Sequence, residues 1–234
     1  MHFRKDLVVS KLLVFDITKL YDLEVYNVLK NAVSATRRKK SEKFLFFEDA
    51  KRCICAEAIM RYYLIKNLGM NNSEIEIVYN EHGKPFLKNI ELYFSLSHSN
   101  EWVVCGWSNN EIGVDIEKID KINIDIAKSS FCKEEYDYIK SGEECEQYKK
   151  FIQIWTLKES YIKYIGKGLT IPLNSFCVKK NADYFNIESD GNIESVFLKQ
   201  LEFSDEYYLT ECSRDDSRME VQEITIEELV NVFM

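Results

Sequence analysis

The sequence predicts an α+β protein. Two observations support this fold class. Segments with helical periodicity and short strand-like segments both occur in each half of the 234 residues. Consecutive strands also follow one another directly, whereas in a parallel doubly wound sheet they would alternate with helices. At roughly 100–200 residues per domain, the length allows one large domain or two small ones.

In the first half, the pattern predicts a strand at 7–15, helices at 18–34 and about 48–67, and a short strand at 74–79. Gly69 ends the second helix, and Gly83-Lys84-Pro85 predicts a turn. Three further strands follow at 92–97, 102–108 and 112–117. Asn109-Asn110 predicts a tight hairpin between the last two, because Asn tolerates a positive φ.

In the second half, the pattern predicts helices at 133–140 and about 146–165. Three strand-like segments follow at 176–179, 195–203 and 207–212, and a helix after Thr225 closes the chain.

Composition excludes several kinds of partner. Lys and Arg number 31 against 39 Asp and Glu, which gives a net charge of −8 and argues against nucleic acid. No apolar segment reaches the ~18 residues of a membrane-spanning helix, so we expect no membrane partner. The seven cysteines include no CxxC pair, which favours free thiols in a reducing cytoplasm.

Two acidic side chains in the strand at 112–117 are candidates for a cation site. Strand alternation places Asp115 and Glu117 on one face and Val114 and Ile116 on the other. A pair of carboxylates on one face suits a hard divalent cation. The alternative is a half-exposed edge strand whose acidic side chains face water.

The helix at 146–165 carries charges beside an apolar stripe. Lys158 lies inside the stripe, and a Lys there is unfavourable unless it meets an opposite charge. Glu159 and Lys163 lie along its edge, four residues apart, and can pair. A snorkelling Lys and a surface ion pair are the alternative interpretation.

Two other segments are candidates for anion binding. Ser97-His98-Ser99 ends a strand with hydroxyl donors, although a histidine without a role would look the same. Residues 37–52 hold seven basic and three acidic side chains, a local charge of +4 that includes Arg37 and Lys40. Such a charge run can also be a solvated helix face.

Taken together and in this order, the motifs resemble the Sfp-type 4′-phosphopantetheinyl transferase family. The family signature consists of GxDxE and, about 40 residues later, WxxKExxxK. The first motif matches Gly113–Glu117 and the second matches Trp155–Lys163. From Asp115 to Glu159 the separation is 159 − 115 = 44 residues. Gly83-Lys84-Pro85 and Ser97-His98-Ser99 match two further family elements, and the likeness covers about residues 34–180.

The resemblance implies a pseudo-twofold pair of similar α+β halves, here expected at 1–110 and 111–234, in a monomer with the active site between them. It implies that phosphopantetheine passes from coenzyme A to a serine of an acyl or peptidyl carrier protein, with release of 3′,5′-ADP. Two alternatives are a non-catalytic carrier-binding protein on the same scaffold and a metal-dependent phosphohydrolase of a nucleotide. The residues do not tell fatty-acid, polyketide and peptide carriers apart.

The resemblance also implies roles for single residues. Mg²⁺ would be held by Asp115, Glu117 and Glu159, and phosphate oxygens would be neutralised by Lys158 and Lys163. The 3′-phosphate of coenzyme A would be held by Ser97, His98, Arg37 and Lys40, with Lys84 and Pro85 beside the adenine. Glu159 is the expected proton acceptor for the serine, Glu135 is the alternative, and Lys163 would stabilise the departing phosphate.

Overall fold

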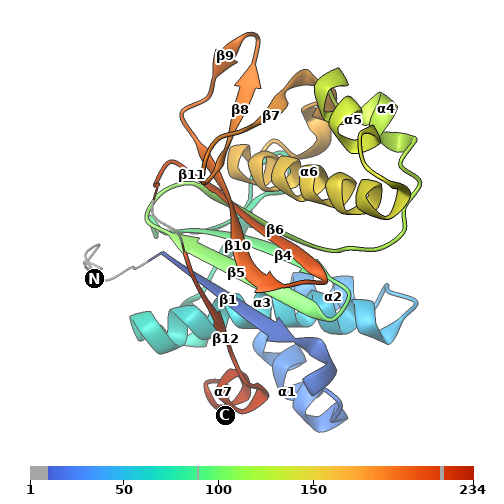
Figure 1. Ribbon diagram of the computed structural model, residues 1–234. Helices are drawn as coiled ribbons and strands as arrows, with labels where there is room; N and C mark the ends of the chain where they lie inside the picture. Colours follow the sequence, from blue (N-terminus) through green and yellow to red (C-terminus); the bar gives the residue numbers. More distant parts are fainter. Residues whose placement is uncertain (1–9, 89, 217–218) are drawn as a thin grey trace.

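The computed structural model describes residues 10–88, 90–216 and 219–234. Two sheets lie between two layers of helices (Figure 1). The helices are α1 (Leu23–Ala32), α2 (Ala35–Ser41), α3 (Phe47–Leu68), α4 (Ile126–Ser130), α5 (Lys133–Lys140), α6 (Glu144–Ile165) and α7 (Ile226–Asn231). The strands are β1 (Lys11–Asp16), β2 (Ile77–Tyr79), β3 (Pro85–Leu87), β4 (Tyr93–Ser99), β5 (Trp102–Ser108), β6 (Ile112–Lys118), β7 (Cys177–Lys180), β8 (Phe185–Ser189), β9 (Asn192–Ile193), β10 (Phe197–Ser204), β11 (Tyr207–Ser213) and β12 (Glu220–Glu223).

The first sheet has the strand order β12-β1-β5-β4. All its pairings are antiparallel except that of β1 with β12, which is parallel and joins the two ends of the chain. Helices α1, α3 and α7 share one hydrophobic core with this sheet, centred on side chains such as Ile59, Leu64 and Trp107. The C-terminal segment therefore completes the first sheet rather than the second.

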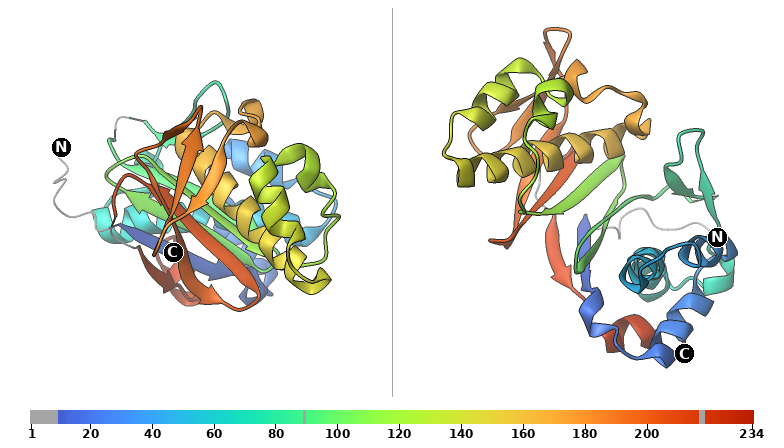
Figure 2. Two further views of the ribbon diagram at one scale, coloured as in Figure 1. Left: turned by 45° about the horizontal axis from the view of Figure 1, so that its top comes forward. Right: turned by 90° about the vertical axis from the view of Figure 1, so that its right-hand side faces the viewer.

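The second sheet has the order β6-β11-β10-β8-β7, with β9 added beside β8. Helix α6 packs across β6 and β11, and a second core holds Phe151, Leu157 and Leu198. A third core, which includes Val14, Val104, Val114 and Leu209, lies between the two sheets. The right-hand view of Figure 2 shows α4 to α6 on one side of the sheets and α1 to α3 on the other.

The two sheets meet along β4 and β6, which are neighbours without sharing a backbone ladder. Alternate serines of β4 point at β6 and bond it through their hydroxyls. These bonds run from Val114 N to Ser95 Oγ (3.0 Å), from Ser97 Oγ to Asp115 Oδ1 (2.7 Å), from Ser99 Oγ to Glu117 Oε2 (2.9 Å) and from Lys118 N to Ser99 Oγ (3.1 Å). We call these contacts the serine seam, and it fixes both carboxylates of β6 relative to the first half.

Gly113 allows α6 to lie directly on β6. A Cβ at this position would stand 1.9 Å from the carbonyl oxygen of Ser160 and 2.4 Å from the amide of Tyr164. Both are backbone atoms of α6, so no side-chain rotation could make room. The glycine of the GxDxE motif therefore sets the distance between Asp115 on the strand and Glu159 on the helix.

Glu57 ties the short helix α2 to the long helix α3. Its buried carboxylate accepts hydrogen bonds from the Ser34 amide (2.6 Å) and from Arg61 Nε (2.8 Å), and it pairs with Arg37 Nε (3.3 Å). Burial by itself would raise the pKa of Glu57, but Arg61 and the Ser34 amide outweigh it and hold the pKa below its usual value. This network fixes the position of α2.

Most of the predicted elements are present, and the α+β class with antiparallel sheets is confirmed. The predicted hairpin at Asn109-Asn110 is wrong, because β5 and β6 belong to different sheets. The hairpin instead joins β4 to β5, where Asn100 takes a positive φ of 47°. The pattern missed α2, α4, β3, β8, β9 and β12. The pseudo-twofold relation and the division at residue 110 stay predictions. Strand β12 and helix α7 follow residue 110 in the sequence but pack with the first sheet and its core.

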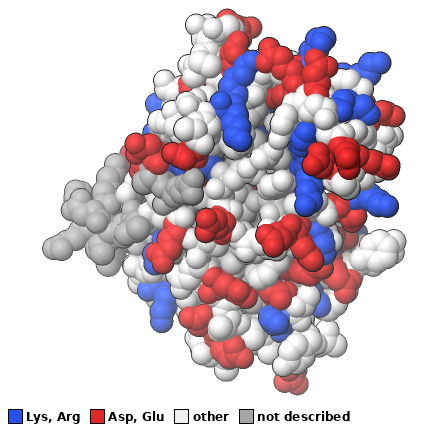
Figure 3. All heavy atoms as spheres, viewed as in Figure 1, with Lys and Arg blue, Asp and Glu red and all other residues white. Residues whose placement is uncertain are grey.

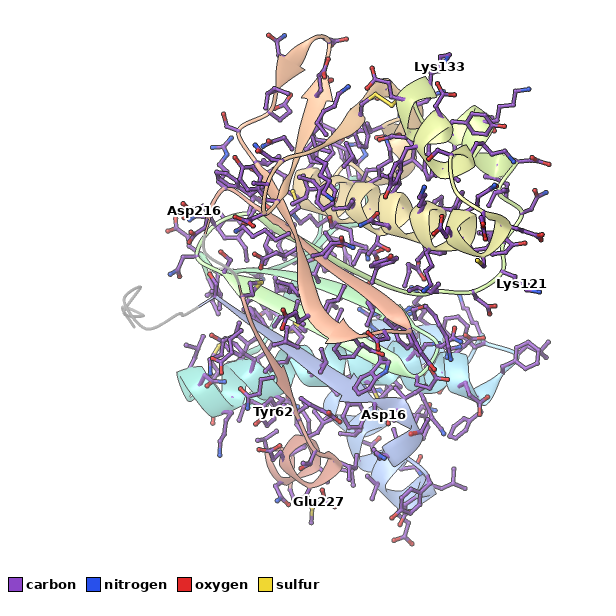
Figure 4. The ribbon with its side chains drawn as sticks, viewed as in Figure 1. Asp16, Tyr62, Lys121, Lys133, Asp216 and Glu227 are labelled. Atoms are coloured by element: carbon purple, nitrogen blue, oxygen red, sulfur yellow. A yellow bond between two sulfur atoms is a disulfide. The ribbon has the colours of Figure 1, made fainter. Side chains whose placement is uncertain are left out.

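The expectation that all the cysteines are free thiols is also wrong. Cys132 and Cys177 form a disulfide that joins the start of α5 to β7, seen in Figure 4 as a yellow bond near the labelled Lys133. Cys53, Cys55, Cys105 and Cys212 are free and buried, and Cys145 is free and exposed. Among the described residues, no helix is long and apolar enough to cross a membrane.

Replacement of Gly113 tests the contact between β6 and α6. We expect Gly113→Ala to lower the free energy of unfolding by about 3 kcal/mol, because the added Cβ would overlap the backbone of α6. Gly191→Ala is the control: its φ of +76° adds a backbone strain that Gly113 does not have, but no atom lies within 4 Å of the added Cβ. We expect the control to lose only about 1 kcal/mol. Equal losses in urea denaturation would contradict the close contact.

Replacement of Glu57 tests the network that holds α2. We expect Glu57→Ala to lower the free energy of unfolding by about 3–5 kcal/mol at pH 7, since two arginines then lose a buried countercharge. The pKa of Glu57 is lowered in the folded state, so its contribution is present above the unfolded pKa of about 4.3 and is lost as the pH falls through the folded pKa. A difference between the two proteins that stays constant down to pH 2 would contradict this. Glu81→Ala, at an exposed carboxylate, is the control.

Candidate active site

A cavity of about 780 Å³ lies between the two halves of the chain. Helix α2 and the segment from β2 to β4 line one side, and β6 and α6 line the other. The lining residues are Thr36, Arg37, Lys40, Ala56, Tyr79, Gly83, Pro85, Leu96, Ser97, His98, Asp115, Glu117, Trp155, Glu159 and Lys163. Nine of the residues singled out in the sequence thus line one cavity: Arg37, Lys40, Pro85, Ser97, His98, Asp115, Glu117, Glu159 and Lys163.

Three carboxylates gather at the end of the cavity formed by β6 and α6. Asp115 and Glu117 come from one face of β6, while Val114 and Ile116 point into the core between the sheets, as strand alternation predicts. Glu159 comes from α6. Burial and the negative charge of Asp115 raise the pKa of Glu117 to about 7. Burial and Asp115 also raise the pKa of Glu159. Asp115 is therefore close enough to repel each of the other two carboxylates.

Lys163 offsets part of this negative charge. Its Nζ lies 2.6 Å from Asp115 Oδ1 and donates to Ser97 Oγ at 2.7 Å. The predicted pair of Lys163 with Glu159 is replaced by these two contacts, one with Asp115 on β6 and the other, across the seam, with Ser97 on β4. Burial raises the pKa of Asp115, and Lys163 lowers it in part. The second oxygen, Asp115 Oδ2, is buried and has no hydrogen-bond partner among the described residues.

The other end of the cavity is basic. Arg37 and Lys40 reach it from α2, whose position Glu57 fixes. His98 also lines the cavity, and desolvation together with the positive charges of Lys163 and Arg52 lowers its pKa to about 4, although its side chain is exposed to solvent. His98 is therefore neutral at physiological pH and can offer one N–H donor and one acceptor without adding charge.

The three carboxylates at the acidic end are candidate ligands for a divalent cation. Within residues 10–88, 90–216 and 219–234, no group of three or more His, Cys, Asp and Glu side chains could hold a metal ion by itself. The chemistry of the groups nevertheless fits one, because they are hard oxygen donors, Asp115 raises the pKa of the other two, and Asp115 Oδ2 has no hydrogen-bond partner in the described part of the chain. A cation that is also held by ligand oxygens and water would relieve this repulsion.

Lys158 and Glu135 do not reach the cavity. Lys158 Nζ is fully buried, lies 2.9 Å from Glu135 Oε1 and donates to the carbonyl oxygens of Leu173 (2.8 Å) and Phe176 (2.6 Å). Glu135 also accepts from the amide of Val178 at 2.7 Å. Burial raises the pKa of Glu135, and Lys158 lowers it in part. The Lys in the apolar stripe thus meets a charge, as expected, but in this arrangement neither group can touch a phosphate or a serine in the cavity.

Lys84 also lies outside the main cavity. Its Nζ binds Glu111 Oε2 (2.7 Å) and the carbonyl oxygen of Tyr164 (2.9 Å) at the end of α6. Nearby, Asn80 Nδ2 donates to the carbonyl oxygen of Gly166 at 2.8 Å. These bonds attach the β2–β3 hairpin to the second half. Lys84 lines an adjoining chamber of about 290 Å³, which shares Pro85, Glu159 and Lys163 with the cavity.

Sequence reasoning missed several lining residues. Thr36, Ala56, Tyr79 and Leu96 all line the cavity. Thr36 lies on α2, whose sequence has no apolar periodicity that would predict a helix. Ala56 and Leu96 are apolar residues whose patterns predict only burial. Their contact with the cavity depends on how the halves pack, which no local pattern reports.

Comparison with known proteins gives consistent matches. Residues 111–212 match the family model of the 4′-phosphopantetheinyl transferase superfamily, and residues 23–109 match that of the 4′-phosphopantetheinyl transferase N-terminal region.

Whole-length relatives agree with the family models. The 4′-phosphopantetheinyl transferase gsp of Aneurinibacillus migulanus is 37% identical over 215 residues, which cover 91% of this chain and 90% of that protein. The 4′-phosphopantetheinyl transferase Sfp of Bacillus subtilis is 32% identical over 85% of this chain and 90% of its own. The 4′-phosphopantetheinyl transferase ffp, also from Bacillus subtilis, is 34% identical over 86% of this chain and 92% of that protein.

Substitutions at the buried pair separate its structural role from a role in binding. We expect Lys158→Met to lower the free energy of unfolding by about 3–5 kcal/mol, because Glu135 is left as an unpaired buried charge. Adding Glu135→Gln should recover part of this loss, since the amide still accepts from Val178 while the charge is gone. Urea denaturation of the two single variants and the double variant measures the coupling. A Lys158→Met protein of unchanged stability with a raised KM for a phosphate-bearing ligand would contradict the structural role.

Proposed function

The chain belongs to the 4′-phosphopantetheinyl transferase superfamily, and we propose that it uses coenzyme A to modify a serine of an apo acyl or peptidyl carrier protein, releasing 3′,5′-ADP. As a member of this family it is an enzyme, a transferase. The choice of donor, acceptor and leaving group is the proposal.

One observation carries this proposal: the cavity between the halves has an acidic end and a basic end. Asp115, Glu117 and Glu159 form the first, and Arg37 and Lys40 form the second. Coenzyme A carries a diphosphate and a separate 3′-phosphate, so a ligand with two phosphate sites would use both ends. The basic end suits the 3′-phosphate directly, because arginine and lysine donate charge-assisted hydrogen bonds to phosphate.

The acidic end suits the diphosphate only through a cation. We propose that Mg²⁺ is held there by Asp115, Glu117 and Glu159, whose donor chemistry fits it. The bound ion would offset the charge of the diphosphate while the bond to the leaving group breaks.

The chain's own residues position the reactants and move the proton. Lys163, held between Ser97 and Asp115, supplies a fixed positive charge beside the phosphate that leaves. His98, a neutral side chain that lines the cavity, can donate one hydrogen bond to a phosphate oxygen. Glu159 is the proposed proton acceptor for the serine hydroxyl, because it lines the cavity while Glu135 is buried against Lys158.

Several expectations from the sequence stay predictions. The carrier can belong to fatty-acid, polyketide or peptide synthesis. We also keep a monomeric state and a cytoplasmic location as predictions. A single chain supplies both sides of the cavity, which supports a monomer as sufficient for activity.

A mass assay tests the proposed function. With coenzyme A and Mg²⁺, an apo carrier should gain about 340 Da, the phosphopantetheine increment on one serine. Chelation of the metal with EDTA should stop the reaction. Asp115→Asn, which keeps the shape but not the charge of the side chain, should lower kcat by roughly 100-fold or more while the protein stays folded. Absence of any mass gain over several carriers would refute the proposal.

The same assay distinguishes the two alternatives. A non-catalytic carrier-binding protein would hold the apo carrier without changing its mass. A phosphohydrolase would release phosphopantetheine from coenzyme A when no carrier is present.

A further inference from the structure

Four consecutive apolar residues are exposed where the connection after α2 enters the first turn of α3. Phe44 is 41% exposed, Leu45 89%, Phe46 64% and Phe47 41%. We call this segment, residues 44–47, the apolar loop. Single exposed apolar residues are normal on a protein surface, but a contiguous run of them is typical of an interaction site.

Folding does not account for the two most exposed members of the loop. Phe47 packs its ring edge-on against Tyr26, 4.9 Å between centroids, and Lys51 lies 5.1 Å above it, so Phe47 contributes to the fold. Leu45 and Phe46 keep most of their surface in water. Each such side chain loses the free energy that burial would give, unless a partner covers it.

The apolar loop lies beside the mouth of the cavity. Helix α2 lines the cavity through Thr36, Arg37 and Lys40, and the loop begins four residues after Lys40. Four residues span at most about 14 Å even when fully extended. Figure 1 shows the loop at the free end of α2, on the same side of the molecule as α4 and α5. In Figure 3 a projection at the right-hand edge, where this loop lies, carries no charged side chain.

The charges around the apolar loop are mostly positive. Glu42 pairs with Lys30 of α1 at 2.9 Å, and Asp49 pairs with Arg52 at 2.5 Å, so two of the three nearby carboxylates are offset, while Glu48 beside the loop is exposed. Lys39 and Lys43, which flank the loop, are exposed. A complementary surface would have an apolar centre and an acidic rim.

We propose that the apolar loop is the docking surface for the carrier protein, which presents an apolar helix face with carboxylates at its edge. This inference rests on the proposed function, because the carrier must bring its serine to the cavity mouth beside the loop. Four side chains are too few for the roughly 800 Å² per partner of a stable dimer. A small, weak interface suits a partner that must leave after each turnover.

Steady-state kinetics with a purified apo carrier test this surface. We expect the double variant Leu45→Ser with Phe46→Ser to raise the KM for the carrier at least tenfold, because hot-spot side chains at an interface are often aromatic. The KM for coenzyme A and kcat should stay within twofold of the original. Ile193→Ser is the matched control, since Ile193 is 58% exposed on β9 and does not line the cavity. It should leave all three constants unchanged.

A charge variant tests the rim separately. Lys43→Glu should raise the KM for the carrier and weaken its dependence on salt, because the positive charge at the rim attracts the partner through long-range electrostatics. Lys43 does not line the cavity, so the KM for coenzyme A should not move.

Other outcomes would overturn the docking proposal and leave the proposed function intact. One is a double variant that modifies the carrier with an unchanged KM. A second is original protein that elutes as a dimer while the double variant elutes as a monomer, which would assign the loop to a second copy of the chain. A third is binding to phosphatidylglycerol vesicles that the double variant loses, with unchanged carrier kinetics. Failure of the original protein to modify any carrier would instead refute the proposed function itself.

Discussion

The serine seam between β4 and β6 is the constraint on which the rest of the structure depends. The two sheets share no backbone ladder where they meet, so the hydroxyls of Ser95, Ser97 and Ser99 supply the hydrogen bonds between β4 and β6, beside the apolar core that also lies between the sheets. Two of these hydroxyls bond Asp115 and Glu117, so the same contacts that hold the halves together also fix the acidic end of the cavity. A substitution that removes one of these hydroxyls is therefore expected to affect both the packing of the sheets and the position of the carboxylates.

The seam and Gly113 together explain the electrostatics of the site. The close approach of α6 to β6 brings Glu159 near Asp115, while the seam buries Asp115 against β4. Burial and the charge of Asp115 raise the pKa of Glu117 and of Glu159, and among the described residues Lys163 is the one cation that forms an ion pair with this group, through Asp115. The cost of this crowding falls when a ligand brings a cation with it, which is the arrangement that the proposed function needs.

Local sequence patterns predicted the site better than they predicted the connections around it. Strand alternation was enough to place Asp115 and Glu117 on one face, and the stripe on α6 was enough to require a charge opposite Lys158. The partner is Glu135, which lies 158 − 135 = 23 residues upstream of Lys158. Its identity depends on tertiary packing, which a local pattern does not report. The Asn109-Asn110 hairpin failed for the same reason, because turn chemistry cannot report that the two strands enter different sheets. Helix α2 was missed because its sequence ATRRKKS has no apolar stripe.

The parallel pairing of β1 with β12 has a consequence for how the chain folds during synthesis. Lys11 pairs with Glu220, a separation of 220 − 11 = 209 residues. The first sheet therefore lacks an edge strand, and its core lacks α7, until nearly the whole chain has left the ribosome. Contacts between such distant residues slow folding, because a long loop must close before they form. The N-terminal half, although made first, is in this sense the last to be finished.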